Sequence, residues 1–256
     1  MKVVILAGGF GTRLAEETDI KPKPMVEIGG RPILWHIMMH YDFYGFKHFV
    51  FLLGYKGEVI KRYLVDFCSG QAGQSESQED RNRTVSNHSR KDWTVELLDT
   101  GIHTQTGGRL KRFAAYSEGK TFMLTYGDGV SDVNLQDLWA FHRSHGKLAT
   151  VTAVRPPTRF GYMKFDGDKV VEFKEKPSRG EGWINGAYFV LEPEVLDYIA
   201  DDRTVWEKEP LEQLAADGQL MAFRHTSFWQ CMDTLYEKRL LEFFWQSGNA
   251  PWKIWK

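Results

Sequence analysis

The stretch VVILAGGFGTRL, residues 3–14, decides the fold of this chain. Its first five residues are apolar and mostly β-branched, and glycines follow at once, which is typical of a buried parallel strand. Glycines after such a strand let the backbone approach a phosphate within hydrogen-bond distance, because no Cβ lies in the way. Thr12 and Arg13 add a hydroxyl group and a cation that can bind phosphate in a bidentate manner. The stretch therefore predicts a polyphosphate site at the carboxyl end of the first strand.

Two common glycine-rich templates do not fit this stretch. A dinucleotide-binding turn requires G-x-G-x-x-G, and Leu14 stands at the position of the third glycine. The phosphate loop of NTPases requires a lysine directly after its last glycine, and here Thr12 follows Gly11. An NAD-dependent oxidoreductase is therefore disfavoured, and the stretch by itself also fits a strand-to-helix turn without a ligand.

A fixed cation is predicted shortly after the glycine-rich turn, in KPKPMV, residues 21–26. Pro22 and Pro24 exclude a regular helix and favour an extended chain. Such a chain would hold Lys23 near the glycine-rich turn. The two features together indicate a phosphate site more strongly than either does alone.

The pattern of apolar residues predicts alternating strands and helices through the first half of the chain. Strands are expected at 3–7, 48–53, 93–99 and 121–126, and helices at 33–44, 57–68, 108–118 and 134–146. This alternation predicts an α/β fold with a Rossmann-like, mixed but mainly parallel sheet flanked by helices. Residues 69–92 are polar and break the pattern, so we expect either a functional loop or an excursion over the surface there.

The second half of the chain predicts a smaller, β-rich part. Strands are expected at 148–154, 162–166, 169–174, 186–191 and 219–224, and helices at 193–200 and 207–217. No clear linker separates the halves, so a single domain over residues 1–256 is the simplest arrangement. Ligands in such sheets bind outside the carboxyl ends of the strands.

Two aspartates follow apolar stretches and are candidate metal ligands. Asp128 stands between Gly127 and Gly129 after the strand at 121–126, and Asp233 follows the apolar stretch at 228–232. Mg²⁺ usually takes one or two carboxylates together with substrate phosphates. Asp128 also fits a type I turn, and Asp233 also fits the N-cap of the following helix.

A polar loop at residues 104–109, TQTGGR, is a candidate site for reading a nucleotide base. The Thr104 hydroxyl and the backbone amides of Gly107 and Gly108 could reach the edge of a pyrimidine. Arg109 opens the following helix, where a cation opposes the helix dipole, so we expect its side chain to face outward. The alternative is an ordinary connecting loop with an exposed arginine.

Composition excludes several classes of protein. The formal net charge is -1, which gives no general attraction to nucleic acid or to an anionic membrane. The two cysteines match no metal-binding spacing, and no signal peptide or apolar run of membrane-spanning length is present, so a cytoplasmic protein is expected. The aromatic tail at 243–255 suggests a sugar site or self-association into a homo-oligomer. His36 and His40 have the spacing of a metal pair, but without a third ligand we expect core histidines.

The glycine-rich turn, PKP at 22–24 and GRP at 30–32 together resemble the signature of the sugar-1-phosphate nucleotidylyltransferases. EKP at 175–177 and WING at 183–186 extend this resemblance over essentially the whole chain. The resemblance implies a nucleotide-binding half over about 1–135, and a sugar-binding half with a C-terminal helical tail over about 136–256.

The resemblance also assigns roles to individual residues. It implies that the nucleotide is bound by Leu6, Ala7, Gly8, Gly9, Phe10, Gly11, Thr12, Arg13, Lys23, Thr104, Gly108 and Arg109. It implies that the sugar phosphate is bound by Tyr126, Gly127, Glu175, Lys176, Asn185 and Gly186. Asp128 and Asp233 would hold Mg²⁺, and Arg13, Lys23 and Asp128 would be catalytic.

The pattern T-G-x-x-T-x-T-G-G-R at residues 100–109 resembles the cytidylyl branch of that family. This implies Mg²⁺-dependent transfer of a cytidylyl group from CTP to glucose 1-phosphate, giving CDP-glucose and pyrophosphate for deoxysugar and O-antigen or lipopolysaccharide biosynthesis. The same reaction with dTTP or UTP is an alternative. A non-catalytic nucleotide-sugar sensor is disfavoured, because Arg13, Lys23, Asp128 and Lys176 are all present.

Overall fold

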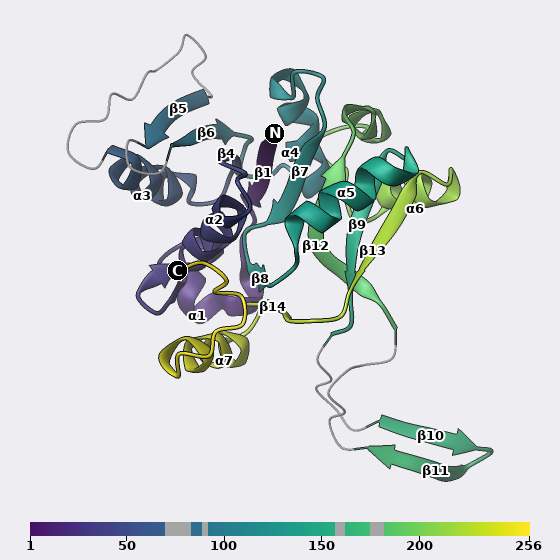
Figure 1. Cartoon of the computed structure of the whole chain (residues 1–256). Helices are drawn as coiled ribbons and strands as arrows, with labels where there is room; N and C mark the ends of the chain where they lie inside the picture. The colour runs from purple at the N-terminus through teal and green to yellow at the C-terminus, as the bar shows by residue number, and fades with distance from the viewer. Residues whose placement is uncertain (70–82, 89–91, 157–161, 175–181) are drawn as a thin grey trace.

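The structure is a computed structural model of residues 1–256, and it describes all of them except 70–82, 89–91, 157–161 and 175–181 (Figure 1). An eight-stranded sheet in the order β13-β9-β12-β7-β1-β4-β6-β5 forms its centre. The strands are β1 (Lys2–Ala7), β4 (His48–Leu53), β5 (Arg83–His88), β6 (Trp93–Asp99), β7 (Phe122–Tyr126), β9 (Ala149–Val154), β12 (Ile184–Leu191) and β13 (Leu220–His225).

The pairing of these strands confirms the predicted fold class. β1 pairs in parallel with β4 and β7, β4 with β6, and β13 with β9. β12 is antiparallel to β7 and β9, and the edge strand β5 is antiparallel to β6. Because the central strands β7, β1, β4 and β6 are parallel, the loops that leave their carboxyl ends lie along one edge of the sheet.

Helices cover both faces of the sheet (Figure 1). Successive side chains of β1 point to opposite faces, so Val3 and Ile5 belong to one apolar core and Val4 to the other. This two-sided burial explains why β1 is apolar throughout. The helices are α1 (Ala15–Thr18), α2 (Ile33–Phe43), α3 (Gly57–Ser69), α4 (Thr106–Phe113), α5 (Leu135–His145), α6 (Glu209–Ala216) and α7 (Leu235–Gln246), and short 3-10 turns occupy Thr12–Leu14, Lys23–Met25, Ala114–Tyr116 and Pro193–Tyr198. No helix in the described residues is long and apolar enough to cross a bilayer.

Three small two-stranded sheets accompany the main one. β2 (Glu27–Ile28) pairs with β3 (Arg31–Pro32), β8 (Gly129–Ser131) with β14 (Trp229–Cys231), and β10 (Tyr162–Asp166) with β11 (Lys169–Lys174). The β10–β11 hairpin extends away from the rest of the molecule (Figure 1). The β8–β14 pair joins segments that are far apart in the sequence, and it lies directly beside the site described below.

The structure differs from the sequence-based expectations at several elements. β5 lies within the polar stretch at 69–92; an edge strand hydrogen-bonds on one side only and tolerates polar residues, so apolar periodicity did not indicate it. The segment at 22–26 is not extended, because Lys23–Met25 forms a 3-10 turn with Pro22 at its N-cap. Helix α4 begins at Thr106 rather than at 108. Gly107 and Gly108 belong to its first turn, where they pack against the neighbouring loop at Asp202 and Thr204.

The aromatic C-terminal tail packs largely into its own chain. Trp252 and Trp255 are buried, and their rings contact His36 of α2. Trp245 lies so close to Gly29 that any side chain at Gly29 would collide with it. Intramolecular packing therefore accounts for these tryptophans, whereas Phe243 of the same tail is exposed, and self-association stays a prediction.

The two histidines with metal-pair spacing lie in the core. His36 is bonded through Nε2 to the Ile28 carbonyl oxygen at 2.9 Å, and His40 to that of Val133 at 2.8 Å. Burial lowers the pKa of each to about 4, so both rings are neutral at physiological pH. They are structural residues, as the sequence suggested.

Candidate functional site

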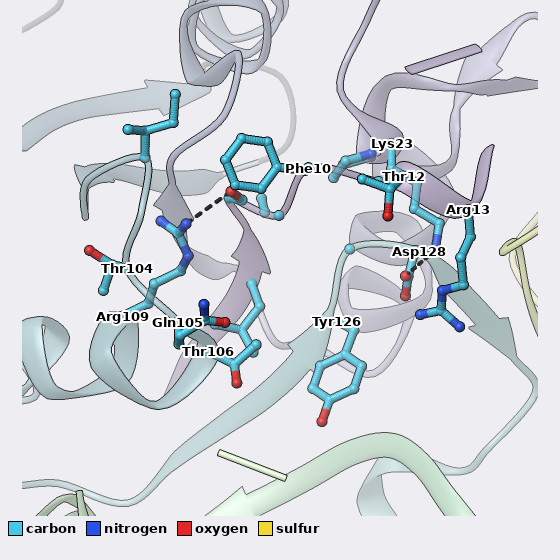
Figure 2. A pocket seen from close by; sticks show the side chains of 18 of the residues that line it. Phe10, Thr12, Arg13, Lys23, Thr104, Gln105, Thr106, Arg109, Tyr126 and Asp128 are labelled. Carbon is cyan, nitrogen blue, oxygen red and sulfur yellow. Dashed lines mark hydrogen bonds and ion pairs between the residues drawn. The ribbon is translucent and has the colours of Figure 1, made fainter. Parts of the chain in front are cut away.

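A cavity of about 440 Å³ lies at the carboxyl edge of the parallel strands (Figure 2). Its walls come from the glycine-rich turn after β1, the loop between β6 and α4, the end of β7, and the segment that precedes α6. The lining residues are Leu6, Ala7, Gly8, Gly9, Phe10, Gly11, Thr12, Arg13, Lys23, Pro24, Ile102, His103, Thr104, Gln105, Thr106, Arg109, Tyr126, Gly127, Asp128 and Glu207. Most of the predicted nucleotide-binding residues are thus brought to one cavity.

The glycine-rich turn is held in place by its backbone. Gly11 has a φ of +67°, a conformation that favours glycine, and its carbonyl oxygen accepts from the Leu14 amide at 3.0 Å. A Cβ on Gly8 would lie 2.3 Å from the Arg109 guanidinium carbon, so only glycine fits there. A Cβ on Gly9, by contrast, would have no neighbour within 4 Å, so this position is open to a ligand.

Lys23 and two carboxylates meet at one end of the cavity. The Lys23 Nζ donates to Asp128 Oδ2 at 2.6 Å and forms an ion pair with Asp233. Arg13 Nη1 contacts the other oxygen of Asp233 at 2.6 Å. Burial favours the neutral amine, but the two carboxylates outweigh it and raise the pKa of Lys23 above its usual value. Lys23 is therefore a permanent cation in the physiological range.

Backbone pairing brings the two aspartates together. β8 follows Asp128 and pairs with β14, which ends just before Asp233, and the Met232 amide donates to the Asp128 carbonyl oxygen at 2.8 Å. The interpretation of Asp233 as a helix N-cap is wrong, because Thr234 caps α7 in a capping box with Glu237. Glu237 also accepts from the Asp233 amide at 2.7 Å. The Asp233 side chain is thus left to face Lys23.

This arrangement fits a divalent cation. The carboxylates of Asp128 and Asp233 share one ammonium group, so both can reach a single small cation, and carboxylate oxygens are the ligands that Mg²⁺ prefers. Within the described residues there is no group of three or more potential metal ligands. A cation held here would take its remaining oxygens from substrate phosphates and water, which is the usual mode for Mg²⁺.

The two glycines of the base-reading loop do not offer their amides to the cavity. Gly107 and Gly108 both donate to the Thr204 carbonyl oxygen, at 3.0 and 3.2 Å. A Cβ on Gly108 would lie 2.5 Å from the Asp202 Cα, so this glycine allows two backbones to approach. The expectation that these amides read a pyrimidine edge is wrong for both, and Gly108 does not line the cavity, whereas Thr104 does.

Arg109 lines the cavity but does not face outward as expected. Its side chain is buried, with the residue only 3% exposed. Nη1 donates to Leu53 O at 2.8 Å, Thr100 Oγ1 at 2.7 Å and Gly101 O at 2.8 Å, while Nη2 donates to Gly8 O at 2.9 Å. Figure 2 shows the guanidinium group turned toward the glycine-rich turn. Burial lowers the pKa of Arg109 to about 10.

The predicted sugar-binding residues are only partly assembled around the cavity. Tyr126 and Gly127 line it, and the Gly127 amide donates to the Leu6 carbonyl oxygen at 3.1 Å. Asn185 does not line it but donates from Nδ2 to the Tyr126 hydroxyl at 3.3 Å. The Gly186 carbonyl oxygen accepts from Trp229 Nε1 at 2.8 Å, so Gly186 has a packing role. Glu175 and Lys176 lie outside the described residues.

Glu207 lines the cavity and was not identified from the sequence. It follows the fully buried Trp206, which anchors the segment before α6. Thr106 Oγ1 donates to Glu207 Oε2 at 2.7 Å and accepts from the Trp206 amide at 2.9 Å. An acidic residue directly after a buried tryptophan was the one available signal, and it is weak because acidic residues are common before helices.

Comparison with known proteins places these observations in a family context. A profile described as "Nucleotidyl transferase" matches residues 2–230. The glucose-1-phosphate cytidylyltransferase of Salmonella typhi is 50% identical over 257 residues, covering 100% of both chains. The probable glucose-1-phosphate cytidylyltransferase of Bacillus subtilis (strain 168) is 42% identical over 272 residues, again covering 100% of both. A solved structure of a putative glucose-1-phosphate thymidylyltransferase from Bacillus anthracis covers 100% of this chain and 98% of its own with a TM-score of 0.69, and at 16% identity this likeness is one of fold.

Proposed function

This chain belongs to the nucleotidyl transferase family, and we propose that it transfers a cytidylyl group from CTP to α-D-glucose 1-phosphate, releasing pyrophosphate and forming CDP-glucose. The observation that carries the proposal is the convergence of Lys23, Asp128 and Asp233 beside an open glycine-rich turn. The choice of CTP and glucose rests on the 50% identity to a glucose-1-phosphate cytidylyltransferase.

The proposed reaction needs little covalent chemistry from the protein. A phosphate oxygen of glucose 1-phosphate attacks the α-phosphorus of CTP, and the bond from that phosphorus to the bridging oxygen breaks as pyrophosphate leaves. The attacking oxygen is already ionised, so no general base is required. Catalysis is therefore positioning and neutralisation of charge, as in other phosphoryl-type transfers.

Each charged group has a part in this scheme. The open turn at Gly9 and the exposed Arg13 hold the β- and γ-phosphates and favour departure of pyrophosphate. Lys23 stabilises charge that develops on the α-phosphoryl group. Asp128 and Asp233 would hold Mg²⁺, which would screen the repulsion between the two anionic substrates. Lys176, which lies outside the described residues, neutralises the sugar phosphate.

Several finer features accompany the proposed reaction. The nucleotide is bound by about 1–135 and the sugar by about 136–256, although one sheet runs through both parts. A cytoplasmic location agrees with the free thiols of Cys68 and Cys231. The apolar side chains that the β10–β11 hairpin exposes support a homo-oligomer. An isolated two-stranded hairpin is marginally stable in water, and packing against a second copy of the chain would stabilise it. The product would supply deoxysugar and O-antigen or lipopolysaccharide biosynthesis.

Pyrophosphate release tests the proposal directly. The chain is incubated with CTP, UTP or dTTP and with glucose 1-phosphate or other hexose 1-phosphates, with and without Mg²⁺. We expect release only with Mg²⁺, and the highest kcat/KM with CTP and glucose 1-phosphate. A preference for UTP or dTTP would assign the same reaction to another base, and no release with any pair would overturn the proposal. Asp128→Asn serves as the metal-site control and should be inactive.

A further inference from the structure

One carboxylate in the cavity has no role in the reaction described above. Glu207 lines the cavity and is partly buried, yet it forms no ion pair with any residue that the structure describes. Oε2 accepts from Thr106 Oγ1 at 2.7 Å, which fixes the orientation of the carboxylate. Thr106 is itself held by the amide of the fully buried Trp206, so the carboxylate stands on a rigid support.

Among the residues that the structure describes, the side chains that interact with Glu207 carry hydroxyl groups, on Thr106 and Tyr126. The Tyr126 hydroxyl interacts with Glu207 and accepts from Asn185 Nδ2 at 3.3 Å. Burial, together with the nearby Glu207 carboxylate, raises the pKa of Tyr126, so the phenol keeps its proton and remains a donor. Figure 2 shows Tyr126 extending away from Lys23 and Thr12, with Thr106 on the same side of the cavity.

Charge decides which part of a substrate can lie here. A carboxylate that pairs with no cation in the described part of the chain repels phosphate groups, whereas Lys23 and Arg13 at the other end of the cavity attract them. A hydroxyl group, in contrast, can donate to a carboxylate, and hydrogen bonds to charged acceptors are the stronger ones. The substrates of the proposed reaction carry hydroxyl groups on the ribose and on the hexose.

We propose that Glu207 is a specificity-determining residue that accepts hydrogen bonds from sugar hydroxyl groups of a bound substrate, with Tyr126 and Asn185 completing the same polar surface. The inference rests on the proposed function for the identity of the substrates. Both substrates carry a hydroxylated sugar ring next to a phosphate, so the ring bound by Glu207 is either the ribose of the nucleotide or the hexose of the sugar phosphate.

Steady-state kinetics of Glu207→Gln test this inference. The amide keeps the size of the side chain and an oxygen for Thr106, but it loses the charge. We expect KM for one substrate to rise about tenfold or more, because a hydrogen bond to a charged group is lost, while kcat changes much less. Glu209→Gln is the matched control: Glu209 is exposed two residues further along, and its substitution should change neither constant.

Deoxy analogues show whether Glu207 binds the ribose or the hexose, and they distinguish direct binding of the substrate from a structural role of Glu207. The penalty of Glu207→Gln should disappear with 2′- or 3′-deoxy-CTP if the ribose is bound, or with a deoxyglucose 1-phosphate if the hexose is bound. Thr106→Val removes the hydroxyl donor to Glu207 but leaves the carboxylate. If Glu207 had only a structural role, Thr106→Val and Glu207→Gln would raise KM equally, with native and with deoxy substrates. That result, or unchanged KM values for both substrates, would overturn the inference. A wild-type chain without activity would instead overturn the proposed function.

Discussion

Replacing Arg109 by methionine tests the role that the structure gives to this residue. The guanidinium group joins three segments: the turn at Gly8, the end of β4 at Leu53, and the loop at 100–101. Its substitution removes four hydrogen bonds, although the Leu53 carbonyl oxygen keeps the Thr100 amide and hydroxyl as donors and the Gly8 carbonyl oxygen keeps the Tyr55 amide. At about 1 kcal/mol for each hydrogen bond, the loss is roughly 4 kcal/mol.

Part of that loss is recovered, because the buried cation is itself unfavourable. Burial lowers the pKa of Arg109 to about 10, which means that its hydrogen-bond partners do not fully compensate for the lost hydration of the guanidinium group. We therefore expect Arg109→Met to lower the free energy of unfolding by about 2–4 kcal/mol. We also expect a raised KM for CTP with a smaller change for glucose 1-phosphate, since the glycine-rich turn and the loop between β6 and α4 lose their common support.

Arg112→Met is the matched control on the same helix. Arg112 is exposed and pairs with the exposed Asp202 at 2.6 Å, and such surface pairs contribute about 0–1 kcal/mol. Urea denaturation followed by tryptophan fluorescence compares the two variants with the wild type. If Arg109→Met is no less stable than Arg112→Met, and its KM for CTP is unchanged, the supporting role assigned to Arg109 is refuted.

Three further predictions concern other residues. Lys23→Ala should lower kcat by about 10²-fold or more, the loss typical of removing one preorganised transition-state donor, while circular dichroism shows a retained fold; turnover near that of the wild type would contradict the assignment. Gly108→Ala should destabilise the chain by roughly 1–3 kcal/mol, because the added methyl meets the backbone of the neighbouring loop, whereas Gly9→Ala, with open space around it, should leave thermal stability nearly unchanged. Burial lowers the pKa values of His36 and His40 to about 4, so the folded protein keeps both rings neutral. The free energy of unfolding should therefore be highest above pH 6.5 and should fall by roughly 3 kcal/mol for each histidine as the pH drops toward 4. A urea midpoint that stays constant over this interval would disprove the effect.

Much of the fold was predictable because it depends on local pattern. The strands at 48–53 and 93–99 were placed without error and α2 within a residue, since each is a continuous or periodic apolar segment. β5 was missed because its sequence, RTVSNH, is mostly polar, and the strand is recognised only by its pairing with β6. The short strands β8 and β14 were missed because each is three residues long, which is too short for a periodic pattern.

The candidate site was predictable to the extent that it follows strand ends. The glycine-rich turn, Thr104, Tyr126 and Asp128 all leave the carboxyl ends of parallel strands, and they line one cavity as expected. The side-chain directions in the base loop were not predictable. The helix dipole argument predicted an outward Arg109, but its guanidinium group is buried and donates to the distant Leu53 and Gly8 as well as to the preceding loop at 100–101.

By itself, the sequence determined the alternation of strands and helices and the phosphate-binding character of the first turn, because both follow from short-range spacing of apolar residues and glycines. Only the tertiary structure decided which charges meet. The β8–β14 pairing brings Asp128 and Asp233 together, and the 3-10 turn at Lys23–Met25 places Lys23 against both. Glu207 reaches the cavity because Thr106 and Trp206 hold its segment there. The physical reason is that these contacts join residues about one hundred or more positions apart, and no local propensity encodes such a distance.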